Sequence, residues 1–314
     1  MAFKTPILFL TFVRLDTTIK VFERIKAQQP LQLFIASDGP RANRPDDKQK
    51  IEEIKNYISK EIDWECEVKT LYRAQNLGCG RAVSGAITWF FENVEQGIIL
   101  EDDCIPEAEF FSFCEDLLER YKTDRRIWEI SGTNLQRGIK RGDGSYYISN
   151  YGGIWGWATW ARAWEKYDYN MSSYETFVNK RQISQIFGKQ QQSFWLKTLK
   201  KAKAIDTWDY QWQFARWSHN GLSVVPNVNL IKNIGFNADA THTLSEPSWY
   251  ELAIGVKKTL GKVKHPLNIE VDTLADDFLF ENYYKQAPLL SRWYQFLKRQ
   301  LNKLKIVKND RQVN

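Results

Sequence analysis

The stretch Gly97-Ile98-Ile99-Leu100-Glu101-Asp102-Asp103 places three consecutive carboxylates directly behind a short apolar run. The apolar run predicts a buried strand. A strand that ends in carboxylates presents them at the edge of a sheet, where a crevice can form. Crowded carboxylates repel one another unless a cation lies between them. The stretch therefore predicts a metal site, and the alternative is an acidic loop before a helix that begins near Pro106.

The first 130 residues alternate between strand-like and helix-like patterns. Strands are expected over residues 6–12, 31–37, 65–71 and up to Leu100, with a helical pattern after each. This order predicts an α/β fold, a doubly wound and mostly parallel sheet with helices on both faces. Ligands of such sheets bind at the carboxyl ends of the strands. Arg14, Asp38, Arg73 and the acidic triplet all follow strands and should line one rim.

The second half of the chain has a different character. A strand is expected over 126–131, helices over 193–203 and 208–218, and a strand pair around Val224 and Leu230 that returns to the sheet. The predicted domains are 1–245, divided into 1–130 and 131–245 where the character changes, 246–287 for an extension and 288–314 for a tail. The tail contains a basic amphipathic helix over 288–304, which predicts either contact with an anionic membrane surface or packing on its own domain.

The charge is unevenly distributed along the 314 residues. From Ser291 onward there are seven basic residues and one acidic residue, and the rest of the chain carries 37 of each. Because the excess of +6 lies wholly in the tail, a nucleic-acid partner is not expected. The four cysteines contain no CxxC pair and there are only three histidines, which disfavours zinc and disulfides and suits a reducing compartment. The first apolar stretch is too short for a membrane span, so a cytoplasmic location is expected.

Several single residues each admit two interpretations. Asp38 could accept an N–H group of a pyrimidine or close a turn, and Arg14 could bind a phosphate or pair with an acidic neighbour. Gly78 and Gly80 could admit a ligand close to the backbone or form a turn. Six of the thirteen tryptophans lie at 155, 157, 160, 164, 208 and 212. They could form a core or a platform for flat sugar rings.

These segments, taken in order, resemble the GT-A (Rossmann-like) fold of nucleotide-sugar glycosyltransferases. GIILEDDCIPEAEFFSFCEDLLERY (97–121) is similar to the metal-binding region of the N-acetylglucosaminyltransferase I family. IASDGPR (35–41), YGGIWGWATWARAW (151–164), DTWDYQWQFARW (206–217) and PNVNLIKNIGF (226–236) are similar to its uracil, acceptor, catalytic-base and domain-closing segments. The resemblance covers roughly residues 5 to 245. It implies that 1–245 is the catalytic domain, with 1–130 as its nucleotide-binding half and 131–245 as its acceptor-side half.

The resemblance implies inverting transfer of a sugar from a nucleotide-diphosphate donor, a UDP-sugar such as UDP-N-acetylglucosamine, to a hydroxyl of a glycan or lipid-linked acceptor. Asp103 would bind Mn2+ or Mg2+. Arg14, Asp38, Arg73, Glu101 and Asp102 would hold the donor. Asp209 would be the general base, with Asp206 as the competing candidate. His242 would contact the metal or pyrophosphate, or remain a loop histidine.

Two other classes of protein remain open. A sugar nucleotidyltransferase also uses a nucleotide-binding sheet, but it would normally carry a glycine-rich, basic phosphate loop where this chain has Leu10 to Thr18. A tryptophan-rich carbohydrate-binding protein would need neither the carboxylate triplet nor affinity for a nucleotide. Metal-dependent binding of UDP separates the transferase from the carbohydrate-binding protein.

Overall fold

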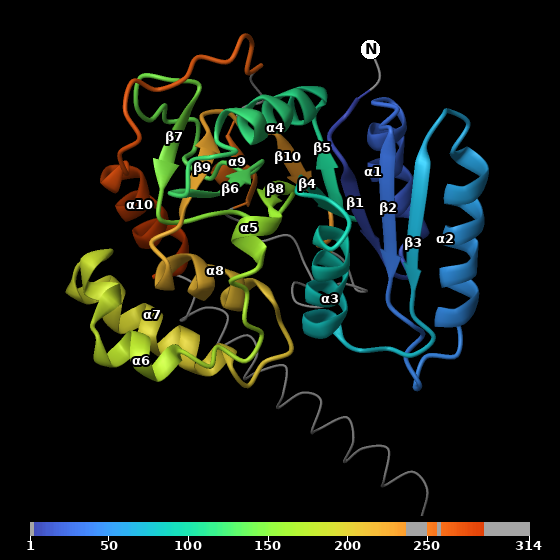
Figure 1. Cartoon of the computed structure of the whole chain (residues 1–314), viewed down its shortest axis with the longest axis horizontal. Helices are drawn as coiled ribbons and strands as arrows, with labels where there is room; N and C mark the ends of the chain where they lie inside the picture. Colours follow the sequence, from blue (N-terminus) through green and yellow to red (C-terminus); the bar gives the residue numbers. More distant parts are fainter. Residues whose placement is uncertain (1–2, 237–249, 256–258, 286–314) are drawn as a thin grey trace, which may run out of the picture. The chain divides into compact units, whose positions relative to one another are not determined.

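The computed structural model describes residues 3–236, 250–255 and 259–285. The chain divides into two compact units, Met1–Thr273 and Leu274–Asn314. The first contains the sheets described below (Figure 1). The described part of the second consists of the end of α10 (Thr273–Leu279) and a π-helix (Phe280–Tyr284). His242, the expected domain boundary at 245 and the basic helix over 288–304 lie outside the described residues, and the domain limits stay predictions.

The central sheet has eight strands in the order β3-β2-β1-β4-β8-β6-β9-β7. Six of them run in one direction, and β8 and β7 run the opposite way. The predicted α/β fold with a mostly parallel sheet is therefore confirmed. In sheet order the bounds are Glu67–Tyr72, Gln32–Ser37, Ile7–Thr11, Gln96–Glu101, Trp157–Trp160, Ile127–Ser131, Leu222–Pro226 and Tyr146–Ser149.

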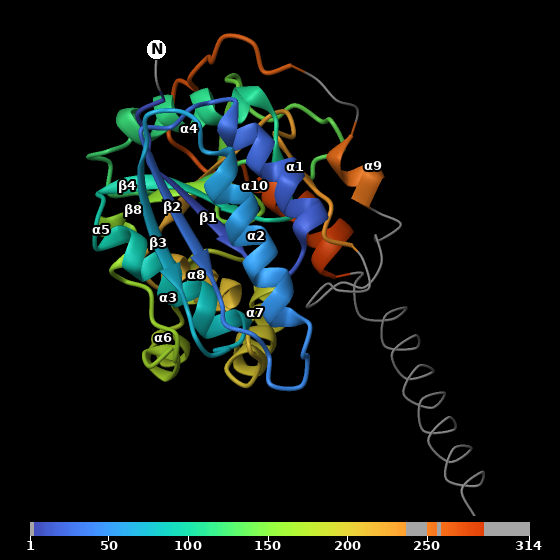
Figure 2. The same ribbon diagram turned by 90° about the vertical axis from the view of Figure 1, so that its right-hand side faces the viewer.

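Helices cover both faces of this sheet, as the doubly wound prediction requires. Side chains alternate along a strand, so Ile7 and Phe9 of β1 pack into one core cluster and Leu8 and Leu10 pack into the other. The first cluster includes side chains of α1 (Leu15–Lys26), α2 (Asp47–Glu61) and α4 (Ala108–Arg120). The second includes those of α3 (Cys79–Phe91), α5 (Ala161–Trp164) and α8 (Asp209–Ser218). In Figure 2, α1 and α2 stand together beside β1 to β3.

The two strands expected around Val224 and Leu230 form, but the expectation that they return to the sheet as a pair is wrong. β9 joins the large sheet between β6 and β7. β10 (Ile231–Asn233) instead pairs antiparallel with β5 (Cys104–Pro106) in a separate two-stranded sheet. The reason lies between the strands, where Asn227 and Asn229 bond to the backbone of other loops and turn the chain away. β10 thus ends beside the acidic triplet.

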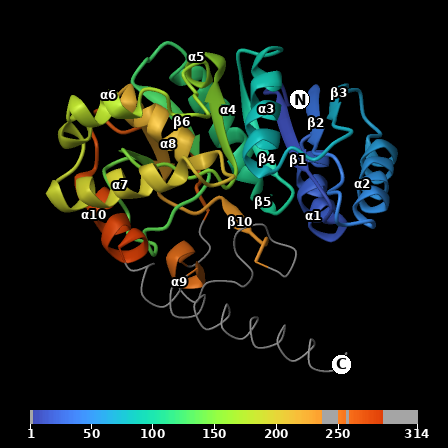
Figure 3. The ribbon, with the colours of Figure 1, turned by 90° about the horizontal axis from the view of Figure 1, so that it is seen from below.

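The remaining described helices of the first unit follow β8 in the sequence. α6 (Tyr174–Asn179), a 3-10 turn (Gln182–Gln185) and α7 (Lys189–Ala202) precede α8, and α9 (Tyr250–Ile254) follows β10. The view from below in Figure 3 shows α3, α8 and β10, which are distant in sequence but line one cavity. The fold thus brings both halves of the chain to a common site.

Candidate active site

The acidic triplet lies where β4 ends and turns into β5, and Arg14 binds it. Glu101 is the last residue of β4, and Asp102 and Asp103 form the turn. Arg14 Nη1 lies 2.8 Å from Asp103 Oδ2, and Nη2 forms an ion pair with Asp102 Oδ1. One guanidinium therefore bridges two carboxylates that are adjacent in sequence.

Burial makes the charged forms of these carboxylates costly. It raises the pKa of Glu101 above its usual range, and the charge of Asp103 adds to this while Arg14 opposes it. Burial likewise raises the pKa of Asp102, against the opposing effect of Arg14. Among the described residues, Asp102 Oδ2 has no hydrogen-bond partner. A cation beside these carboxylates would stabilise their charged forms, as Arg14 does in this structure.

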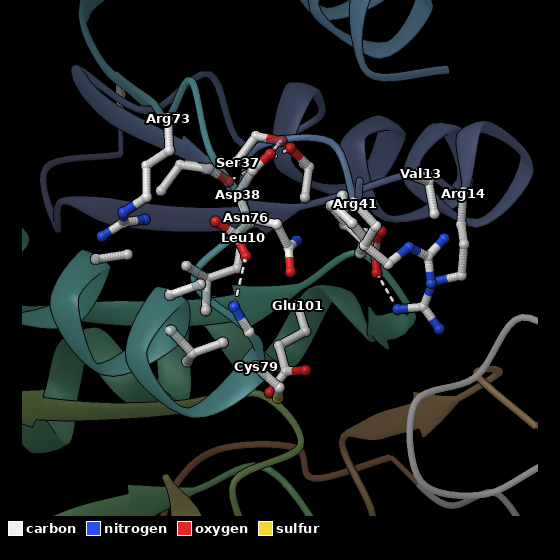
Figure 4. Close-up of a pocket in the computed structure, with 18 of the residues that line it drawn as sticks. Leu10, Val13, Arg14, Ser37, Asp38, Arg41, Arg73, Asn76, Cys79 and Glu101 are labelled. Atoms are coloured by element: carbon white, nitrogen blue, oxygen red, sulfur yellow. Dashed lines mark hydrogen bonds and ion pairs between the residues drawn. The ribbon is translucent and has the colours of Figure 1, made fainter. Parts of the chain in front are cut away.

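A first cavity of about 270 Å³ opens at the carboxyl ends of β1, β2 and β4 (Figure 4). Arg73 lies at one end in this view and Arg14 at the other, with Asp38 and Glu101 between them. Besides these, its lining includes Arg41, Asn76, Cys79, Asp102 and Asp206 and the apolar side chains of Leu10, Ala82, Val83 and Ala86. Three arginines beside an apolar wall suit a ligand with a flat ring and phosphates.

Asp38 lines this cavity, but its carboxylate closes the loops around it. Oδ1 accepts the backbone N–H groups of Gly39 and Leu77 at 2.9 and 3.0 Å. Oδ2 accepts those of Leu77 and Gly78 at 3.0 and 3.1 Å. The turn-closing interpretation of Asp38 is thus present in the structure, and a contact with a pyrimidine stays a prediction.

The two glycines at the start of α3 make room for Asp206. Asp206 Oδ1 accepts the backbone N–H of Gly80 at 2.9 Å. A Cβ at Gly78 or Gly80 would overlap the Asp206 carboxylate, and Gly78 has a φ of +81°. Asp206, the competing candidate for the base, therefore lines the first cavity and bonds to the N-terminus of α3. The GxG spacing alone does not indicate this contact.

A second cavity of about 450 Å³ adjoins the first and shares Arg14, Cys79 and Glu101 with it. Asp103 and Asp209 line this second cavity and do not line the first. Asp209 is the first residue of α8, and its Oδ1 accepts a hydrogen bond from the Thr207 hydroxyl. The sequence-predicted residues that line the second cavity are thus Arg14, Glu101, Asp103 and Asp209. Asp38 and Arg73 line only the first cavity.

The tryptophan cluster serves mostly as core. Trp157, Trp160, Trp164, Trp208 and Trp212 are buried. Trp155 is half-buried and lines the second cavity together with Ile154, Ile205, Tyr210 and Phe236. Its ring meets Phe236 and Tyr250 edge to face, with centroids 6.1 and 5.7 Å apart. Trp155 is thus the cluster member placed to act as a platform.

Glu129 supports this cavity and was not singled out from the sequence. It is fully buried in β6, where Oε2 accepts the Trp212 indole N–H at 2.6 Å and Oε1 accepts the Gly153 N–H at 2.9 Å. The buried Arg216 lies 3.4 Å from Oε2. Glu129 therefore links α8, which carries Asp209, to the loop that carries Trp155. The sequence signal that could have indicated this role is a single glutamate within an apolar strand pattern.

The donor atoms at the triplet fit a metal that is shared with a substrate. Within the described ranges, no group of three or more His, Cys, Asp or Glu side chains could enclose an ion. Asp103 offers a carboxylate at the second cavity, and Mg2+ and Mn2+ commonly bind one or two carboxylates together with phosphates and water. The residues therefore fit a divalent cation completed by phosphate oxygens, and they do not fit an all-protein cage.

Comparisons with known proteins yield structural matches only. No protein-family model matches the sequence, and no curated protein matches it. TarS residues 1–349 of S. aureus matches over 74% of this chain and 59% of its own, with 9% identity and a TM-score of 0.40. The match to HddC of Yersinia pseudotuberculosis covers 52% of this chain and 80% of that one, with 13% identity and a TM-score of 0.32. The match to a putative glucose-1-phosphate thymidylyltransferase of Bacillus anthracis covers 52% of this chain and 73% of that one, with 7% identity and a TM-score of 0.33.

This chain therefore spans less than two thirds of the first of these structures. Such distant likenesses leave the functional proposal to rest on the site itself. Among the described helices, none combines the length and the apolar character that crossing a bilayer requires.

Proposed function

We propose that this protein is a metal-dependent, inverting glycosyltransferase that moves a sugar from a nucleotide-diphosphate donor to a hydroxyl group. The observation that supports this is the pair of adjoining cavities with the carboxylate triplet at their shared wall. The first cavity offers arginines and an apolar wall. The second offers the carboxylate of Asp209, which does not line the first cavity, beside aromatic rings. Two substrates placed in these cavities would meet at Glu101.

The first cavity is the proposed donor site. The base of a UDP-sugar would pack against Ala82, Val83 and Ala86 at the end of the cavity that holds Asp38 and Arg73. Its phosphates would approach Arg14 at the other end. Asp102 would bind the ribose or hold its neighbours, and Glu101 would contact the sugar. UDP is favoured over GDP by the similarity of the Asp38 segment to a uracil-binding strand end.

The second cavity is the proposed acceptor site, with Asp209 as general base. Asp209 would take the proton of the acceptor hydroxyl as that oxygen attacks the anomeric carbon from the side opposite the leaving phosphate. The Thr207 hydroxyl holds one carboxylate oxygen of Asp209 and so fixes its direction. Asp103 would hold Mn2+ or Mg2+, which when bound neutralises charge on the departing diphosphate.

The aromatic side chains of the second cavity indicate which class of acceptor would fit there. Trp155 and Tyr210 present apolar surface beside Asp209, and the apolar face of a sugar ring fits such surface. A glycan or a lipid-linked sugar is therefore the proposed acceptor.

Calorimetric titration of UDP and GDP, with Mn2+ and with EDTA, tests the donor site. We expect UDP to bind only with the metal, and Asp103→Ala to abolish that binding because the carboxylate that holds the metal is gone. Asp63→Ala is the matched control, because Asp63 is exposed and pairs with Lys26. Absence of nucleotide binding under every condition would reject the transferase and favour the carbohydrate-binding protein.

A second variant tests the base. Asp209→Asn keeps the size of the side chain but removes its ability to take a proton. We expect UDP affinity to stay within about twofold and transfer to fall by about 10²–10⁴-fold, measured by UDP release with a panel of sugar acceptors. Loss of UDP affinity in this variant would remove Asp209 from the role of base.

A further inference from the structure

Arg14 occupies the position at the acidic triplet that a cation would otherwise fill. Its guanidinium contacts Asp103 Oδ2 through Nη1 and Asp102 Oδ1 through Nη2. The two carboxyl groups are buried and lie at the wall between the cavities. A divalent cation that binds Asp103 through Oδ2 would therefore compete with the guanidinium for that oxygen.

The backbone of Arg14 is anchored, so that such a displacement would be a movement of the side chain. Its carbonyl oxygen accepts the Thr18 backbone N–H at 3.0 Å and the Thr18 hydroxyl at 2.6 Å, at the start of α1. The guanidinium also lines both cavities. A side chain that pivots here can exchange its carboxylate partner for an anion in the first cavity.

We propose that Arg14 couples metal binding to donor binding: it holds Asp103 in the free protein and releases it when a nucleoside diphosphate supplies the guanidinium with another anion. This inference rests on the proposed function and adds an order to it. Metal alone competes with Arg14 and binds weakly. Nucleotide alone meets no metal for its phosphates. When both are present, the nucleotide draws Arg14 away from Asp103, and the metal then binds that carboxylate. Metal and nucleotide strengthen each other's binding by the same factor, because one coupling free energy links the two sites.

Electron-spin resonance of Mn2+ measures the metal affinity without any enzymatic assay. In the absence of nucleotide, we expect Arg14→Ala to bind Mn2+ at least tenfold more tightly than the wild type, because the competing cation is gone. We also expect the factor by which UDP strengthens Mn2+ binding to fall at least fivefold in this variant. Unchanged or weaker Mn2+ binding by Arg14→Ala without nucleotide would overturn the proposal.

Arg73→Ala is the matched control. It removes the same charge from the wall of the same first cavity, but Arg73 has its electrostatic partner in Asp38 and forms no ion pair with the triplet. If the effect of Arg14 came only from long-range charge, both variants would bind Mn2+ alone more tightly to a similar extent. A similar gain in the two variants therefore contradicts a specific exchange at Asp103.

Guanidinium ion added at millimolar concentration distinguishes the proposed exchange from a merely structural role of Arg14. It should weaken Mn2+ binding to Arg14→Ala by refilling the vacated position and leave the wild type unchanged. If Arg14→Ala does not fold, as judged by near-ultraviolet circular dichroism of the tryptophan core, Arg14→Lys replaces it. The ammonium pairs with one carboxylate at a time, so we expect Mn2+ affinity above the wild type, and an equal affinity contradicts the proposal.

The outcomes separate this inference from the proposed function. Metal-dependent UDP binding with no effect of Arg14→Ala on Mn2+ alone would keep the transferase and reject the exchange. Tighter Mn2+ binding by Arg14→Ala in a protein that binds no nucleotide would reject the transferase and show that Arg14 competes with metal without coupling it to a donor.

Discussion

At the scale of single residues, Cys79 shows how the site acts on its own side chains. It is the first residue of α3, where a helix N-terminus would lower the pKa of a thiol. Burial and the nearby charges of Glu101, Asp206 and Asp209 act in the opposite direction and raise its pKa to about 12. Burial and carboxylates thus outweigh the helix dipole at this position.

This pKa predicts how the alkylation of Cys79 depends on pH. The thiolate is the reactive form, so with a pKa near 12 its alkylation rate should rise about tenfold per pH unit from pH 8 to 10 without a plateau. Site-resolved mass spectrometry after pulses of iodoacetamide measures the rate. The urea-unfolded chain is the control, in which the rate should level off above about pH 9. A plateau near pH 8.5 in the folded protein would contradict the buried, acidic surroundings.

At the scale of elements, Glu129 fixes how α8 sits on the sheet. Its carboxylate joins Trp212 of α8 to Gly153 of the loop before Trp155, and Arg216 lies beside it. Gly152 must stay a glycine here, because a Cβ would overlap the Glu129 carboxylate. Asp209, the proposed base, and Trp155, the proposed platform, are therefore positioned by one buried group.

Removing that group should destabilise the fold strongly. Glu129→Ala leaves Arg216 buried without its counter-charge, so we expect the free energy of unfolding to fall by about 3–5 kcal/mol. Urea denaturation followed by tryptophan fluorescence measures it. Glu67→Ala, at an exposed position that pairs with Lys69, should change stability little. A small loss for Glu129→Ala would mean that water or a neighbour replaces the carboxylate.

At the scale of the whole molecule, the site draws on both halves of the first unit. β1, β2 and β4 supply Arg14, Asp38 and Glu101 through the ends of parallel strands, while α8 and the loop before β8 supply Asp209 and Trp155. A ligand that contacts both halves favours the folded state over the unfolded state by mass action.

We therefore expect UDP and Mn2+ together to raise the melting temperature. At a hundred times the dissociation constant the stabilisation is about 2.7 kcal/mol, which corresponds to a rise of about 4 °C for a protein of this size. Differential scanning calorimetry measures it, with Asp103→Ala as the control that should lack the metal-dependent part. Equal rises with and without metal in the wild type would contradict metal-dependent donor binding.

The sequence by itself determined the α/β class, the parallel order of the first strands and the position of the acidic triplet at a strand end. These follow from local periodicity, because alternation of apolar residues sets which strand face is buried and short connections limit the topology. It also indicated that Arg14, Asp38 and Glu101 share a rim, because parallel strands end at the same edge.

Only the tertiary structure decided which polar groups pair with one another. Asp38 bonds to the backbone of the loop at Leu77, Asp206 bonds to Gly80, and Glu129 meets Arg216. It also separated β10 from β9 and Trp155 from the buried tryptophans. Partners that are 39, 126 and 87 positions apart leave no periodic signal in the chain. A buried polar group takes whichever partner the packing brings within reach, because leaving it unpaired costs more than any local preference.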